Sequence, residues 1–334
     1  MRGGAGNGAW KVLAAQRLRA AYRKILEESD FIAQQHELKK NGVAFYNFWK
    51  ASDSGNRWFA RFLQRPALFR LSKSRRVAFI SVFGDRDIVQ RIKADVVIFY
   101  TGENLTNHPT YGDHLFGEVD LSLGFDFLER PDYLRFPCWL LMCFEPHFTL
   151  SDIEYQLRIG TGLRHSILNR PPMEASMLAR YDPDGSRARV ADLFSQFGQV
   201  HYGGLFRNGG ITVPPGPDNK IAFLRRYPFT LCPENSSRVG YVTEKLFHAF
   251  SAGCIPVYAG SPQANIEPGI INDTAILRFH LEQPNSLASN LAALRDHRTV
   301  LQDWSERDPF LTGAAERIYS YYLQLERQLA DLLA

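Results

Sequence analysis

Residues 233–260, PENSSRVGYVTEKLFHAFSAGCIPVYAG, concentrate side chains that could bind a phosphate-bearing ligand. Glu234 and Asn235 open the segment, Tyr241 lies near its middle, and the pair Glu244 and Lys245 follows. A lysine attracts phosphate by its charge, and a carboxylate accepts hydrogen bonds from vicinal hydroxyls such as those of a ribose. These residue types predict a site for an anion that carries hydroxyl groups. On spacing alone, a capping motif that only closes a helix explains Glu244 equally well.

The elements around this segment should place its polar side chains at one edge of a sheet. The apolar runs 229–232 and 254–258 are typical of buried strands. Thr243 can cap a helix that Gly253 ends, and the apolar residues between them recur at helical spacing. Strands joined through a loop and a helix run parallel, so the loop lies at the carboxyl edge, where open α/β sheets bind ligands.

The same alternation of strands and helices continues along the chain. A helix is predicted from about residue 10 to residue 38, and an amphipathic helix closes the chain. Further strands are predicted at 43–49, 77–82, 96–100, 121–125, 166–168 and 275–279. This alternation favours α/β layers with parallel sheets.

The segment FTLCPENSSRVGYVTEKLFHAFSAGCIPVYAG closely resembles the signature of the bacterial-type α-1,3-fucosyltransferases of glycosyltransferase family 10, whose donor is GDP-fucose. Upstream, VIFYTGENLTNHP at 97–109 and DLSLGFDFLERPDYLRFPCWL at 120–140 resemble other motifs of that family. Weaker similarity covers HSILNRP at 165–171 and GGLFRNGG at 203–210. The chain departs from the pattern at Ala259, where bacterial members often have tryptophan.

The resemblance implies roles for the residues of the donor side. Glu244 should bind the ribose, and Lys245 and Arg207 should hold the diphosphate. The remaining donor-pocket residues it implies are Tyr241, Glu234 and Asn235. Arg207 stands in a glycine-rich loop, which lets the backbone approach phosphate closely. Without the resemblance, Arg207 is interpreted as a solvated loop arginine.

The resemblance also implies a catalytic base. Glu103 follows the predicted strand 96–100, and a carboxylate at the carboxyl end of a strand can take a proton from a sugar hydroxyl. By itself, one glutamate in a loop would more often cap a turn or pair with a basic side chain. Asp120 and Asp126 are weaker candidates for the acceptor side.

The fold class implied is α/β of the GT-B type, with two Rossmann-like domains facing each other across a cleft. Residues 1–150 would bind the acceptor and include a basic amphipathic N-terminal helix. Residues 151–334 would bind GDP-fucose, and the final helix would pack back on the N-terminal domain. The 334 residues are long enough for two such domains.

The reaction implied is inverting transfer of L-fucose from GDP-fucose to an acceptor that contains N-acetylglucosamine or glucose, on an oligosaccharide or glycolipid. Lipopolysaccharide synthesis and protein glycosylation are the settings that fit. No cofactor is expected, and no metal in the chemical step. The runs Asp85-Arg86-Asp87 and Asp182-Pro183-Asp184 are short, and we interpret them as a helix cap and a turn. The alternatives are a transferase of another nucleotide sugar and a catalytically silent glycan- or nucleotide-binding protein.

Charge and cysteines bear on partners and compartment. A net charge of +4, without a polybasic tract, predicts no nucleic-acid partner. The four cysteines form no CxxC pair and favour a reduced, cytoplasmic protein. The basic rim of the N-terminal helix predicts peripheral contact with the inner face of a membrane, although an ordinary packed helix explains the amphipathic pattern more simply.

Overall fold

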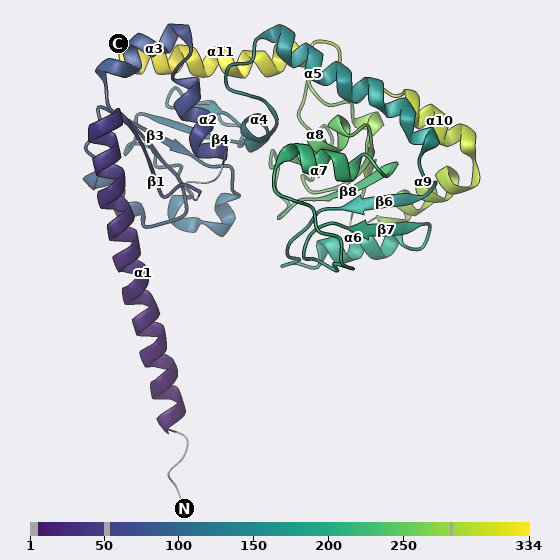
Figure 1. Ribbon diagram of the computed structural model, residues 1–334, viewed down its shortest axis with the longest axis horizontal. Coiled ribbons are helices and arrows are strands. Elements are labelled where there is room, and N and C mark those ends of the chain that lie inside the picture. The colour runs from purple at the N-terminus through teal and green to yellow at the C-terminus, as the bar shows by residue number, and fades with distance from the viewer. Residues whose placement is uncertain (1–5, 50–53, 281–282) are drawn as a thin grey trace, which may run out of the picture. The chain divides into compact units, whose positions relative to one another are not determined.

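The computed structural model describes residues 6–49, 54–280 and 283–334. These residues form two compact units, which are described separately (Figure 1). The first unit runs to Ser122 and also contains Gln328–Ala334, and the second unit comprises Leu123–Arg327. The domains predicted at 1–150 and 151–334 are defined by the ligands they would bind, so that boundary stays a prediction.

The first sheet has five strands in the order of the sequence, and the division between the units lies within its fourth strand. The strands are β1 (Val43–Tyr46), β2 (Val77–Ile80), β3 (Val96–Tyr100), β4 (Leu121–Gly124) and β5 (Tyr133–Arg135). β1, β2 and β3 pair in parallel, with Val43 opposite Val77 and Val77 opposite Val96. Every residue of β2 is buried, which explains its unbroken apolar sequence VAFI.

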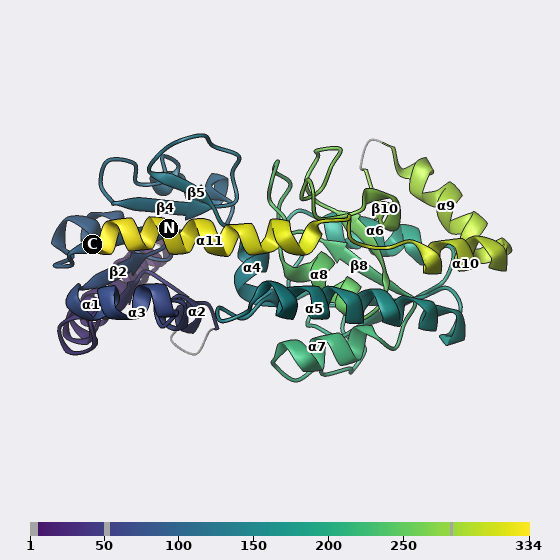
Figure 2. The ribbon, with the colours of Figure 1, turned by 90° about the horizontal axis from the view of Figure 1, so that it is seen from above.

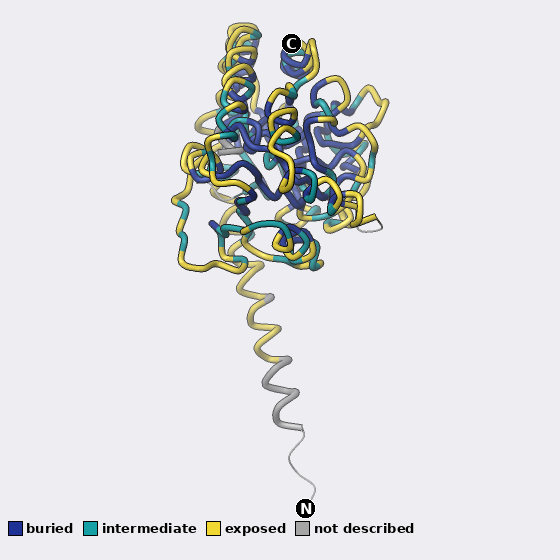
Figure 3. Tube along the Cα trace, turned by 90° about the vertical axis from the view of Figure 1, so that its right-hand side faces the viewer, coloured by how far each residue is buried: buried dark blue, intermediate teal, exposed yellow. Residues whose placement is uncertain are grey.

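Helices of the first unit pack around this sheet. They are α1 (Gly6–Asn41), α2 (Ser54–Phe62) and α3 (Pro66–Ser74), with short 3₁₀ helices at Arg86–Arg91, Leu105–Asn107 and Pro109–Tyr111. The long first helix was expected. Its C-terminal half contributes Phe31 and Leu38 to the core, whereas Leu18 and Ile25 are exposed. Most of the described part of this helix is exposed (Figure 3).

The second sheet also has five strands, and all of its pairings are parallel. Its order is β10-β9-β8-β6-β7, with bounds β6 (Glu174–Met177), β7 (Gln199–Tyr202), β8 (Phe229–Pro233), β9 (Ile255–Ala259) and β10 (Leu277–Arg278). β6 and β8 are neighbours, although β7 lies between them in sequence. The direction of the chain across the sheet therefore reverses at β6 and β8, and ligands of α/β sheets bind outside the carboxyl ends at such a point.

Helices cover both faces of the second sheet. The remaining helices of the chain are α4 (Cys138–Cys143), α5 (Leu150–Leu163), α6 (Ser186–Phe194), α7 (Pro217–Leu224), α8 (Glu244–Ser251), α9 (Pro284–Asp296), α10 (Arg298–Glu306) and α11 (Ala314–Leu333), with 3₁₀ helices at Arg164–Asn169 and Asp273–Ala275. α7 and α8 lie on one face and α6 on the other (Figure 1), and α5 runs beside α8 (Figure 2). No helix in the described parts of the chain has a long enough apolar stretch to cross a bilayer.

Most predicted strands are confirmed to within two or three residues, and the α/β class is confirmed. The strand predicted at 166–168 is wrong, because this stretch belongs to the 3₁₀ helix Arg164–Asn169. Buried Arg164 explains the difference, since its guanidinium donates to the carbonyls of Trp304 and Ala275, both at 3.0 Å. β5, β6 and β7 were not predicted.

Candidate functional site

Glu234 organises the loop between β8 and α8. Its side chain is buried, and Oε1 accepts from the Thr243 amide at 2.8 Å. Oε2 accepts from Thr243 Oγ1 at 2.6 Å and from Lys245 Nζ at 2.9 Å. Thr243 occupies the N-cap position of α8, but its side chain makes no cap hydrogen bond, because the hydroxyl is committed to Glu234. Glu234 therefore holds the start of α8 in place.

The first turn of α8 carries two ionised groups of opposite sign. Burial works to lower the pKa of Lys245, but the charges of Glu234 and Glu244 outweigh it and hold that pKa above its usual value. Burial works to raise the pKa of Glu244, whereas Lys245 and the nearby His248 and Lys220 lower it to about 2. Both side chains are therefore charged at neutral pH, as binding of phosphate and of hydroxyls requires.

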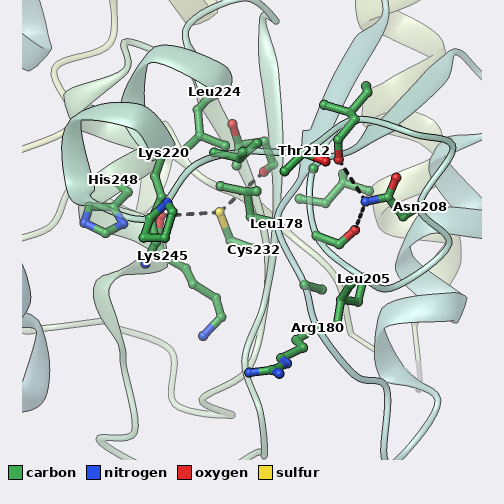
Figure 4. Close-up of a pocket in the computed structure, with 18 of the residues that line it drawn as sticks. Leu178, Arg180, Leu205, Asn208, Thr212, Lys220, Leu224, Cys232, Lys245 and His248 are labelled. Atoms are coloured by element: carbon green, nitrogen blue, oxygen red, sulfur yellow. Dashed lines mark hydrogen bonds between the residues drawn. The ribbon is translucent and has the colours of Figure 1, made fainter. Parts of the chain in front are cut away.

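A cavity of about 380 Å³ lies at the carboxyl ends of β6, β7 and β8. Lys220, Lys245 and His248 stand together at one side, with Asn208 and Leu205 at the other (Figure 4). The apolar part of the lining includes Leu178, Leu205, Ile211, Val213, Pro214, Pro215, Leu224 and Leu231. Apolar walls with a few converging polar groups are typical of sites for small organic ligands, and the volume suits one. Glu244 also lines the cavity, so the predicted pair Glu244 and Lys245 is brought together there.

His248 was not singled out from the sequence, although it lies one helical turn after Glu244 on the same face. It is buried, and burial lowers its pKa to about 4, against the opposing effect of the Glu244 charge. The imidazole is therefore neutral at the wall of the cavity. Lys220 of α7 was not identified from the sequence, because no motif there indicates that α7 packs against α8.

Arg207 is not among the residues that line this cavity. It lies in the loop after β7, with φ +47, and its guanidinium pairs with Asp192 of α6. The hydrogen bond that Arg207 donates to the Asp192 carboxylate raises the pKa of Arg207. The structure thus places Arg207 near the carboxyl edge of the sheet but engages it with a carboxylate.

Asn235 and Tyr241 occupy different environments in the loop. Asn235 is exposed, and its Oδ1 accepts from Nη2 of buried Arg187, the second residue of α6. Tyr241 is buried, and its ring lies 5.1 Å from that of Phe125. Gly240 precedes Tyr241 at φ +79, where a side chain would contact the Phe125 carbonyl at 2.8 Å. Tyr241 is thus held by packing.

Asp126, a predicted acceptor-side residue, belongs to the second unit. Its Oδ1 pairs with Arg238 Nη2 at 2.8 Å, which links the segment after β4 to the loop between β8 and α8. Arg135 holds the same segment, because it donates to the Phe125 carbonyl at 2.9 Å and pairs with Glu267 at 2.7 Å. Asp126 therefore helps to fix the position of the loop.

Glu103 lies in the first unit, just beyond the carboxyl end of β3. The Thr101 hydroxyl accepts from the Glu103 amide and donates to its carbonyl, each at 3.0 Å, so Thr101 fixes the main chain of the turn at residue 103. Glu103 is half-buried. Asp120 lies at the opposite end of β3, where its carboxylate accepts from the Val97 amide at 2.7 Å. The structure does not bring Asp120 and Glu103 together.

The two Asp-x-Asp runs act as caps. Asp85 accepts from the Asp87 amide at the start of a 3₁₀ helix. Asp182 accepts from the amides of Arg187 and Ala188, and Asp184 from that of Ser186, at the start of α6. Within residues 6–49, 54–280 and 283–334, no three His, Cys, Asp or Glu side chains group in a way that could hold a metal ion.

Two family models match this chain. Residues 43–142 match the N-terminal domain of α-(1,3)-fucosyltransferase FucT, and residues 169–309 match the C-terminal part of glycosyltransferase family 10 (fucosyltransferase). An α-(1,3)-fucosyltransferase FucT of Helicobacter pylori is 25% identical over 258 residues, which cover 70% of this chain and 51% of that protein. The GDP-fucose protein O-fucosyltransferase 3 of Bos taurus is 35% identical over 128 residues, covering 35% of this chain and 26% of that protein. The chain thus spans about half the length, or less, of these curated relatives.

The fold resembles that of solved α-1,3-fucosyltransferase structures. One crystal structure superposes with a TM-score of 0.57 at 22% identity, covering 85% of this chain and 89% of the other. A second, described as the enzyme with GDP-fucose, superposes with a TM-score of 0.54 at the same identity and coverage. The predicted GT-B class of α/β fold is thereby confirmed.

Proposed function

Because this chain belongs to the α-1,3-fucosyltransferases of glycosyltransferase family 10, we propose that it moves L-fucose from GDP-fucose to a hydroxyl of a glycan that contains N-acetylglucosamine or glucose, with inversion at the anomeric carbon. The observation that carries the proposal is the cavity at the start of α8, where Glu244 and Lys245 meet beside apolar walls.

The residues of the second unit supply the chemistry that a nucleoside diphosphate needs. Lys245 would neutralise part of the diphosphate, and the partial positive charge at the N-terminus of α8 favours an anion at the same place. Glu244, ionised at neutral pH, would accept from the ribose hydroxyls. Arg207 would join the diphosphate by exchanging Asp192 for phosphate, since both are anions and its ion pair is partly exposed.

Glu103 would act as the general base. Its carboxylate takes the proton of the acceptor hydroxyl while that oxygen forms a bond to the anomeric carbon of fucose. The bond from this carbon to the diphosphate oxygen breaks, and GDP leaves with the electron pair. Attack from the face opposite the leaving group inverts the configuration. Lys245 and the start of α8 stabilise the charge that develops on GDP, so we expect no metal in this step.

Two alternatives deserve a direct test. The first is a transferase of another nucleotide sugar, because Ala259 leaves more room than the tryptophan that bacterial relatives often have. The second is a glycan- or nucleotide-binding protein without activity. The ionised pair in the cavity and the position of Glu103 favour the transferase.

A panel of nucleotide sugars tests the donor. The intact chain should be stabilised against heat by GDP and GDP-fucose, and should transfer only fucose to an N-acetylglucosamine-containing acceptor. UDP, ADP and CDP sugars serve as controls. The panel is repeated in EDTA, where transfer should continue at a similar rate. Stabilisation by UDP sugars alone would contradict GDP-fucose as the donor. Loss of transfer in EDTA that manganese restores would contradict a transfer step without a metal ion.

We also propose that α1 lies on the inner face of a membrane, where glycolipid acceptors are assembled in the cytoplasm. Exposed apolar side chains gather near the middle of this helix and include Leu18, Tyr22 and Ile25. Arg17, Arg19, Arg23 and Lys24 flank them, all exposed. Apolar residues beside a basic rim suit an anionic lipid surface, where each basic residue contributes about 1 kcal/mol.

Liposome flotation tests this contact. Leu18→Ser, Tyr22→Ser and Ile25→Ser combined should abolish flotation with vesicles that contain anionic lipid. Substitution is preferable to truncation, because Phe31 and Leu38 of the same helix belong to the core. Tyr155→Ser with Ile159→Ser, at exposed positions of α5, is the matched control and should float like the parent. If the parent and the triple variant floated with the vesicles to the same extent, α1 would be an ordinary helix that does not bind the membrane.

A further inference from the structure

His248 lies in the wall of the cavity at the start of α8, and the proposed function gives it no role. It is the fifth residue of α8 and lies one helical turn after Glu244, about 6 Å further along the helix axis. Lys220 of α7 stands beside it at the same side of the cavity (Figure 4). The two side chains therefore face whatever part of a ligand lies beyond Glu244.

The hydrogen bonds of His248 determine which ring nitrogen is left to accept. The imidazole donates to the main-chain carbonyl of Met142, and its buried Nε2 has no hydrogen-bond partner among the residues that the structure describes. The donor is therefore Nδ1. Because burial lowers the pKa of His248 to about 4, the ring is neutral at pH 7 and Nε2 carries a lone pair without a proton.

An unpaired acceptor at this depth is unfavourable. His248 is only 7% exposed, and a buried polar atom without a partner costs free energy that a hydrogen bond would restore. A ligand that donates a hydrogen bond to Nε2 would supply the missing partner. The site thus favours a group with an N–H or O–H at the position of His248.

The position of His248 along α8 indicates which part of a nucleotide reaches it. In the proposed function the diphosphate lies at Lys245 and the ribose at Glu244, so the base is the next group along the ligand. Apolar residues of the cavity wall, among them Leu178 and Leu224, suit the faces of a flat aromatic ring. The edge of the base would then meet the polar pair of His248 and Lys220.

This pair is complementary to one edge of guanine. Guanine presents an acceptor, O6, beside a donor, N1–H, whereas adenine presents a donor, its 6-amino group, beside an acceptor, N1. His248 Nε2 can only accept, and the Lys220 ammonium can only donate. Adenine would therefore place a donor against Lys220 and a lone pair against His248. Uracil presents the same pair as guanine, but on a single, smaller ring.

We propose that His248 and Lys220 recognise the base of the nucleotide sugar, with His248 Nε2 accepting from guanine N1–H and Lys220 Nζ donating to O6. This inference rests on the proposed function. Glu244 and Lys245 would contact the ribose and the diphosphate, which all nucleoside diphosphates share. His248 and Lys220 would instead select guanine over adenine, because adenine leaves both buried polar groups unpaired.

The test compares the intact chain with His248→Leu, which removes the acceptor. Titration calorimetry measures the affinity of each for GDP, inosine diphosphate and ADP. The parent should bind GDP and inosine diphosphate similarly, because both carry O6 and N1–H, and should bind ADP more weakly. His248→Leu should weaken GDP about 10- to 100-fold and leave ADP unchanged, so the preference for guanine falls by that factor. Lys220→Met should lower the same preference.

Two further variants serve as rescue and control. His248→Gln keeps an acceptor oxygen at a similar reach and should recover most of the preference for GDP. Ser251→Ala changes another residue of α8, which lines a neighbouring cavity of about 470 Å³ but not this one. This control should bind all three nucleotides like the parent.

Several outcomes would contradict the inference. One is a His248→Leu variant with the same ratio of GDP to ADP affinity as the parent. Equal losses for GDP and ADP with a lower melting temperature would show a structural histidine, and so would failure of both His248→Leu and His248→Gln to fold. Inosine diphosphate binding as weakly as ADP would exclude recognition through N1–H. A parent chain that binds ADP or UDP as tightly as GDP would instead contradict the proposed function.

Discussion

Glu103→Gln should lower fucosyl transfer by about 10²–10⁴-fold, because glutamine cannot accept the proton of the acceptor hydroxyl. GDP affinity should barely change, since the nucleotide cavity is built from the second unit alone. Melting temperature should hold too. The hydrogen bonds between Thr101 and residue 103 use the main chain, and the substitution is nearly isosteric.

A matched control for this prediction is Glu118→Gln in the same unit. Glu118 is also half-buried, but it pairs with Arg86, so its loss should lower stability and leave the turnover of folded protein unchanged. Turnover, GDP affinity and melting temperature measured together thus separate a catalytic from a structural carboxylate. A Glu103→Gln variant that transfers fucose near the parent rate would remove Glu103 from catalysis.

Lys245→Met should have the second largest effect, and on two quantities at once. GDP binding should weaken by about 1.5–3 kcal/mol, the usual worth of a charged hydrogen bond. Stability should also fall, by up to about 3 kcal/mol, because the buried Glu234 carboxylate loses its counter-charge. Calorimetry gives the first quantity and denaturant unfolding the second.

A double variant separates these two effects. Glu234→Gln combined with Lys245→Met removes both charges, so much of the lost stability should return while GDP affinity stays low. Thr243 can still bond to the side chain at 234, which keeps the start of α8 in place. If GDP affinity recovered together with stability, Lys245 would act on the nucleotide only through the fold.

The sequence predicted the part of the second unit from β8 to β9 well, and the reason is physical. Both strands are fully buried, so they appear as unbroken apolar runs, and Gly253 ends α8 at φ +68, which favours glycine. β6 escaped notice because EASM contains none of the branched and aromatic residues typical of strands. Because β6 was not recognised, Arg187 was not identified as a residue in the first turn of a helix at the carboxyl edge of the second sheet.

Residue types alone do not show which acidic residue of the motif is structural and which lines the cavity. Glu234 and Glu244 are both acidic residues of one motif, yet Glu234 is buried against Thr243 and Lys245 while Glu244 lines the cavity. Such a difference depends on where each side chain points after folding. Arg207 was predicted to hold the diphosphate, but in the structure its guanidinium pairs with Asp192. Asp192 lies on α6, a helix that was not predicted.

The most direct test of the account is to follow the reaction of the intact chain with GDP-fucose by NMR. The acceptor is a glycan that contains N-acetylglucosamine, as in the proposed function. The account predicts that GDP is released in step with formation of a fucosylated product whose anomeric configuration is inverted relative to the donor. Product of retained configuration, or release of GDP with only free fucose formed across a panel of glycan acceptors, would contradict it.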